Sequence, residues 1–104
     1  MQPIIDTHRA ELAALGRRFH VRRLDLFGSA ATGEFDQDRS DLDFLVLFDP
    51  LPPAAYAKAY FGLHEALADL FKRNIDLLTE PSLTNPYLRA QIEAERQTLF
   101  DAAA

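Results

Sequence analysis

The chain contains no cysteine among its 104 residues, and this absence excludes several kinds of chemistry. Without cysteine there is no disulfide, no thiolate metal site and no cysteine nucleophile. No apolar run reaches the length of a membrane-spanning helix, and no basic segment followed by an apolar one marks a secretory signal. We therefore expect a cytoplasmic protein that has no membrane partner.

Positive charge is also scarce. Lys and Arg number 11 against 16 Asp and Glu, so the formal net charge is −5. Binding to nucleic-acid backbones without sequence preference requires a basic protein surface. The net negative charge therefore argues against general nucleic-acid binding. One local basic cluster runs from Arg17 to Arg23. The cluster is either a solvated helix end followed by an edge strand, or a positive rim for a triphosphate or an acidic partner surface.

Two well-known ligand-binding motifs are missing. No Gly-Lys-Ser or Gly-Lys-Thr occurs, so a P-loop is excluded. The segment that starts at Asp36 begins like an EF-hand calcium loop, but its sixth position is Asp41, where glycine is needed. Its twelfth position is Leu47, where a bidentate glutamate is needed, and the residues that follow are typical of a strand rather than a helix.

The remaining composition is that of an ordinary globular protein, with 48% hydrophobic and 26% charged residues. We expect residues 1–104 to form a single domain with one modest core. Apolar periodicity predicts helices over 2–19, 54–71 and 86–95, a helical turn over 30–33, a polar loop over 34–40, and strands over 21–27, 42–48, 74–78 and 98–100. The predicted fold class is α/β or α+β, with a small mixed sheet of roughly three to four strands flanked by helices.

Local signals refine two of these elements. The segment 42–48 is nearly all apolar, which is typical of a central strand covered on both faces. Asn85 and Pro86 form a good helix start, with asparagine as the cap and proline at the first helical position.

Asp41 and Asp43 open the most apolar strand and, at i and i+2, point to the same face. Two ionised carboxylates beside an apolar core repel each other, and a divalent cation removes that penalty. Ligands that are all oxygens favour magnesium or manganese over zinc. Asp76 lies within another short strand and joins the same site if that strand is the neighbour; otherwise it merely caps a strand edge.

Gly28 and Ser29 end the first predicted strand. Gly28 allows close approach of the backbone to a phosphate, and Ser29 adds a hydroxyl and an N–H at the start of a helical turn. A phosphate cradle opposite paired carboxylates predicts nucleotidyl transfer assisted by a pair of metal ions. In that interpretation Asp41 and Asp43 bridge the ions, while Asp76 binds the ion that activates the attacking hydroxyl.

The run from Leu26 to Gly33, followed by the run from Ser40 to Val46, resembles the minimal nucleotidyltransferase (MNT) family of the polymerase-β-like superfamily. The signature of that family is Gly-Ser, about ten residues, then Asp-x-Asp. Here eleven residues separate Ser29 from Asp41. The segment 74–78 resembles the family's third-acid strand, so the resemblance extends over nearly the whole chain.

The resemblance implies a polymerase-β-like nucleotidyltransferase fold, magnesium as the cofactor, and ATP as a substrate. It assigns catalysis and metal binding to Asp41, Asp43 and Asp76, and nucleotide binding to Gly28 and Ser29. Many small members are paired with a helical HEPN protein, an RNase toxin, and neutralise it by transferring AMP from ATP onto a toxin tyrosine. The expected partners are therefore a HEPN toxin and ATP, in a homo- or hetero-oligomer that the sequence does not specify.

Two other functions stay open. A binding module would block the HEPN partner by contact alone, and a different nucleotidyltransferase would act on a small-molecule hydroxyl. The intact set of Gly28, Ser29, Asp41, Asp43 and Asp76 favours the protein-modifying enzyme over the binding module. The absence of an additional acceptor domain counts against the small-molecule enzyme.

Overall fold

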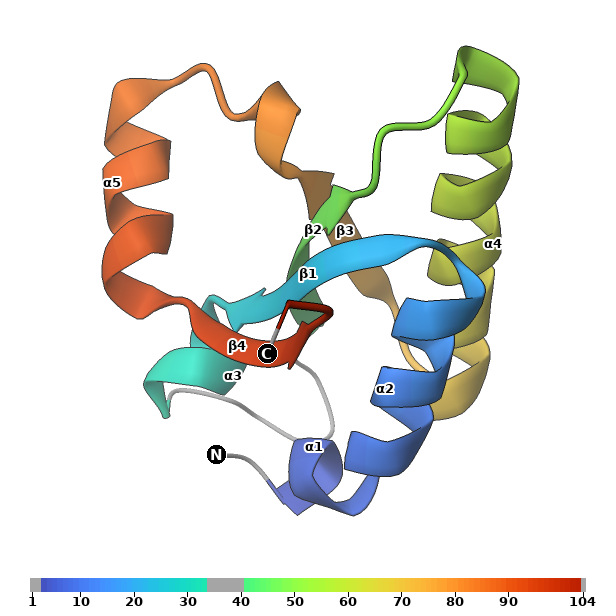
Figure 1. Ribbon diagram of the computed structural model, residues 1–104. Helices are drawn as coiled ribbons and strands as arrows, with labels where there is room; N and C mark the ends of the chain where they lie inside the picture. The colour runs from blue at the N-terminus through green and yellow to red at the C-terminus, as the bar shows by residue number, and fades with distance from the viewer. Residues whose placement is uncertain (1–2, 34–40, 104) are drawn as a thin grey trace.

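The computed structural model describes residues 3–33 and 41–103 (Figure 1). Its helices are α1 (Pro3–Thr7), α2 (Arg9–Arg18), α3 (Ser29–Thr32), α4 (Pro53–Phe71), the short 3-10 helix η1 (Glu80–Ser82) and α5 (Pro86–Glu95). Its strands are β1 (Val21–Phe27), β2 (Leu42–Phe48), β3 (Ile75–Thr79) and β4 (Gln97–Asp101). The predicted polar loop 34–40 lies outside the described residues.

The strands form one mixed sheet in the order β3-β2-β1-β4. β1 is antiparallel to β2 and β4, while β2 and β3 are parallel and are connected through α4. The predicted fold class is confirmed, and β2 is an inner strand as its apolar sequence indicated. β1 is an inner strand too, so the interpretation of the basic cluster as leading into an edge strand is wrong. β4, which lies near the C-terminus, pairs with the outer edge of β1 and so makes β1 an inner strand.

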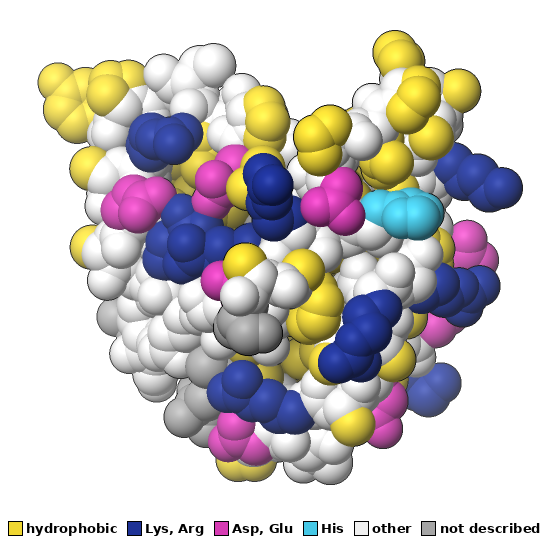
Figure 2. Space-filling model, viewed as in Figure 1, with side chains coloured by type: hydrophobic (Ala, Val, Ile, Leu, Met, Phe, Trp, Pro, Cys, Tyr) yellow, Lys and Arg dark blue, Asp and Glu magenta, His cyan; other side chains and the backbone are white. Residues whose placement is uncertain are grey.

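Each face of the sheet has its own core because side chains alternate along a strand. One face packs against α1, α2 and α4 through Leu24, Phe44 and Leu63, all fully buried. The other face packs against η1 and α5 through a smaller cluster that contains Leu45 and Ile92. In Figure 1, α2 and α4 accordingly lie on one side of the sheet and α5 on the other. Figure 2 shows the surface hollowed between α5 and the first turns of α4.

The uninterrupted helix predicted over 2–19 is wrong, because the chain turns at His8 between α1 and α2. At this point two side chains make hydrogen-bond contacts with backbone carbonyls of α1. The Thr7 hydroxyl donates to the Pro3 carbonyl at 2.8 Å, and Nδ1 of His8 lies 2.7 Å from the Ile4 carbonyl. Such side-chain bonds compete with the regular helical pattern. The half-buried His8 ring packs edge-on against Phe71, with ring centres 5.2 Å apart.

The predicted start of α5 is confirmed. Oδ1 of Asn85 accepts the backbone N–H groups of Tyr87 and Leu88 at 2.9 and 3.3 Å, and Pro86 occupies the first turn. Within the described residues, no helix has both the length and the apolar character that crossing a membrane requires.

Candidate active site

The turn after β1 is built around Gly28. This residue has φ 71° and ψ −153°, in a region that side chains disfavour, and α3 begins at the next residue. The carbonyl of Gly28 accepts the N–H groups of Ala31 and Thr32 at 3.0 and 3.1 Å. Gly33 then ends α3 in the left-handed conformation, which confirms the predicted helical turn.

A second constraint on Gly28 is spatial. Phe27 is paired with Asp43 across the β1–β2 ladder, which places the turn directly beside that aspartate. A Cβ atom built on Gly28 would collide with Oδ2 of Asp43. The absence of a side chain at Gly28 therefore keeps the backbone turn and the Asp43 carboxylate in direct contact.

The sheet brings Asp76 alongside Asp43. In the parallel pairing of β2 with β3, Asp43 stands opposite Asp76, one position after the Leu42–Ile75 pair. Leu42 and Ile75 are buried in the larger core, so both aspartates belong to the opposite face of the sheet. The expectation that the Asp76 strand lies beside the Asp43 strand is thus confirmed. Asp76 itself is exposed, on the edge strand of the sheet.

Negative charges converge on Asp43. Half-burial of its carboxyl, which is the largest cause, and the charges of Asp76, Asp41 and Glu95 together raise its pKa from 3.8 to about 6. Asp41 is exposed and immediately precedes β2. The site therefore concentrates carboxylates, and their charge favours a proton or a metal ion at Asp43.

Glu95 is a site residue that sequence reasoning did not identify. It is the last residue of α5, and its Oε2 accepts the backbone N–H of Gly28 at 3.2 Å, from 67 residues along the chain. One signal was present in the sequence: α5 carries no basic residue in its last turn, where cations are favoured by the helix dipole. An acid at that position suggests a partner outside the helix.

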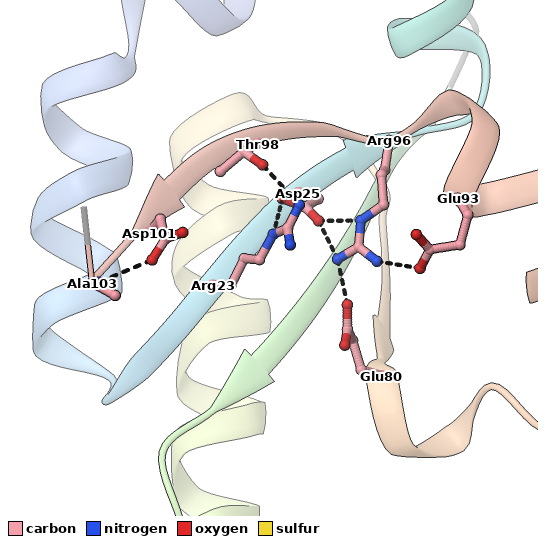
Figure 3. Close-up of polar contacts among 8 residues, drawn as sticks. All are labelled: Arg23, Asp25, Glu80, Glu93, Arg96, Thr98, Asp101 and Ala103. Carbon is pink, nitrogen blue, oxygen red and sulfur yellow. Dashed lines mark hydrogen bonds and ion pairs between the residues drawn. The ribbon is translucent and has the colours of Figure 1, made fainter.

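Arg96 anchors the segment that follows Glu95. As Figure 3 shows, its guanidinium contacts Asp25, Glu80 and Glu93, and so connects β1, η1 and α5. Asp25 is fully buried on β1 and also pairs with Nε of Arg23 at 3.1 Å. Burial opposes the charge of Arg96, but its hydrogen bonds to Glu80 and Asp25 outweigh this effect and raise its pKa.

Within the described residues, the carboxylates around Asp43 do not form a complete metal-binding site. Over residues 3–33 and 41–103, no three His, Cys, Asp or Glu side chains are placed so that they could hold a metal ion. The arrangement nonetheless combines backbone N–H groups at the Gly28 turn with acids on two adjacent strands. Chemically, this pairing suits a phosphate-containing ligand that brings its own cation.

Comparison with protein families decides the identity. A model described as a nucleotidyltransferase domain matches residues 5–99. The chain belongs to the nucleotidyltransferase family. This nucleotidyltransferase is 35% identical over 83 residues to the protein adenylyltransferase MntA of Thermococcus cleftensis, an alignment that covers 80% of this chain and 77% of that protein. The predicted membership and the predicted enzyme class are both confirmed.

Solved structures show the same relationship. A candidate minimal nucleotidyltransferase is 32% identical, with a TM-score of 0.73 over 89% of this chain and 90% of that chain. A toxin–antitoxin complex with AMP-PNP contains a chain that is 25% identical, with a TM-score of 0.68 over 89% of this nucleotidyltransferase and 73% of that chain. The fold described above is therefore that of minimal nucleotidyltransferases.

Proposed function

We propose that this nucleotidyltransferase is a magnesium-dependent protein adenylyltransferase. In this proposal it transfers AMP from ATP to a tyrosine of a HEPN RNase toxin and thereby acts as the antitoxin. The observation that carries the proposal is the contact between the Gly28 turn and Asp43, with Asp76 alongside on β3. The similarity to MntA and to a toxin–antitoxin complex supports the choice of AMP and of a toxin partner.

The residues of the site fit a magnesium nucleotide. The donors are carboxylate oxygens, and the pKa of Asp43 is raised first by burial and then by neighbouring negative charge, which a cation would neutralise. Asp41, Asp43 and Asp76 would hold the magnesium, and Gly28 and Ser29 would contact the phosphates. When bound, magnesium neutralises phosphate charge and lowers the pKa of the attacking hydroxyl.

The transfer step follows from this assignment. The tyrosine oxygen forms a bond to the α-phosphorus of ATP, and the bond from that phosphorus to the pyrophosphate oxygen breaks. Asp76 accepts the hydroxyl proton, directly or through water, as pyrophosphate leaves. Asp76 is accessible for this role because it is exposed on the edge strand β3.

A protein acceptor also agrees with the character of the surface. Tyr87 on α5 is 86% exposed and Phe61 on α4 is 68% exposed. Exposed aromatic side chains of this kind are common in protein interfaces. Cytoplasmic location, where ATP is available, completes the proposal.

The deciding experiment measures the mass of the partner. A HEPN protein, sought first among the neighbouring reading frames, is incubated with the nucleotidyltransferase, magnesium and ATP, and its intact mass is recorded together with its RNase activity. We expect a gain of one or more AMP units that parallels the loss of RNase activity. Complete neutralisation of a partner whose mass is unchanged would refute the enzyme and support the contact-only antitoxin.

A further inference from the structure

The backbone N–H of Gly28, which would contact a nucleotide phosphate, is already engaged. Glu95 accepts it through Oε2 at 3.2 Å. A carboxylate oxygen resembles a phosphate oxygen in charge and in hydrogen-bonding capacity, and both bind backbone N–H groups well. A phosphate at this turn would therefore need the donor that Glu95 already uses.

Neighbouring contacts hold Glu95 in this position. Nε2 of Gln91, one turn earlier on α5, donates to Oε1 of Glu95 at 3.3 Å. Two residues after Glu95, Nε2 of Gln97 donates to the carbonyl of Ala31 at 2.9 Å. Between them, Arg96 is fixed to the buried Asp25 (Figure 3). The junction of α5 with β4 is thus fixed at three successive residues, through Glu95 to Gly28, through Arg96 to β1 and through Gln97 to α3.

The electrostatic setting makes the Glu95 contact replaceable. An acid at the carboxyl end of a helix is disfavoured by the helix dipole. Glu95 also adds its charge to a site where Asp41 and Asp76 already repel Asp43. The magnesium ion of a bound nucleotide would place positive charge beside these acids, whereas Glu95 brings none.

We propose that Glu95 occupies the phosphate position of the nucleotide-free enzyme and leaves the Gly28 N–H when ATP binds. This inference rests on the proposed function, because it takes the Gly28 turn as the phosphate site. Glu95 keeps the turn ordered while the site is empty, and it lowers the affinity for ATP because each binding event must break its hydrogen bond. The affinity for ATP falls because the Gly28 N–H can bind either Glu95 or a phosphate, but not both at once.

The first test compares ATP affinities by calorimetry in the presence of magnesium. Glu95→Ala removes the competing carboxylate, so we expect it to bind ATP on the order of three- to tenfold more tightly than the wild type. Gln91→Ala leaves Glu95 in place but untethered, and should tighten binding by only about twofold. Glu65→Gln, which removes one charge from an exposed position on α4, is the matched control and should leave the affinity unchanged.

The second test observes Gly28 directly. The chain has only 4 glycines, so selective ¹⁵N-glycine labelling gives a sparse amide spectrum. Without nucleotide, the Gly28 resonance should differ between wild type and Glu95→Ala. With saturating ATP and magnesium, the Gly28 resonances of the two proteins should coincide, because phosphate has replaced the carboxylate in both.

Three results would overturn the inference. Weaker ATP binding in a folded Glu95→Ala variant would make Glu95 a supporting ligand rather than a competitor. Unchanged affinity would make its contact with Gly28 irrelevant to the nucleotide. Absence of ATP binding by the wild type would instead remove the proposed function itself, and the inference with it. Thermal unfolding of each variant confirms that the comparison is made between folded proteins.

Discussion

Replacing Asp43 by asparagine should make the nucleotide-free protein more stable while destroying its function. Asp43 has a pKa raised to about 6 by burial and by three neighbouring acids, whereas a free aspartate has the value of 3.8. For an acid with a raised folded-state pKa, stability is greatest below the unfolded value and is lost as the pH rises toward the folded value. Above about pH 7 the ionised carboxylate therefore weakens the folded state, and Asp43→Asn relieves this effect.

The size of the pKa shift of Asp43 sets the expected gain in unfolding free energy for Asp43→Asn. A difference of roughly two pKa units corresponds to at most about 3 kcal/mol. Asp43 is only half-buried, so solvent screening reduces the expected gain to roughly 1–2 kcal/mol. For a domain of this size that gain raises the melting temperature by about 5–10 °C at pH 8. The gain should shrink as the pH falls from 6 toward 4, where the wild-type carboxyl becomes protonated.

Urea denaturation of wild type and Asp43→Asn at pH 8 and pH 4.5 measures this difference. Asp69→Asn, at an exposed position on α4, controls for the general loss of one negative charge. Addition of magnesium and ATP should then reverse the order at pH 8, because ligand binding stabilises only the wild type. A gain that is equal at both pH values, or no larger than that of the control, would refute the argument from charge convergence at Asp43.

Further predictions address the turn, the third acid and the buried ion cluster. Gly28→Val should lose ATP binding, because a side chain there meets Asp43; a variant that unfolds normally and still binds ATP would show that the turn is not the phosphate site. Asp76→Asn should retain most ATP affinity but lose transfer on the order of a hundredfold or more, measured as AMP incorporation into the partner. Arg96→Met leaves the buried Asp25 with Arg23 alone and should cost about 3 kcal/mol of unfolding free energy. The double variant Arg96→Met with Asp25→Asn should recover part of that loss, and strictly additive losses would contradict the pairing.

Short-range patterns made much of this protein predictable. The apolar run 42–48 correctly marked β2 as an inner strand, and the period of two along a strand predicted that Asp41 and Asp43 share a face. The cap at Asn85 and the turn at Gly28 follow equally local rules, because each depends on the conformations of a few adjacent residues.

The tertiary structure determined the contacts between segments that lie far apart in the sequence. The parallel register of β2 and β3 sets Asp76 opposite Asp43, and the pairing of β4 with β1 turns a predicted edge into the interior of the sheet. Glu95 reaches Gly28 only because α5 packs back across the sheet, from 67 residues away. Contacts of this kind depend on how whole elements pack and pair. The periodicity of a single segment does not specify which distant segment will lie beside it. The residues of the nucleotidyltransferase motif are therefore apparent from sequence, while the carboxylate that competes for its turn is apparent only in the fold.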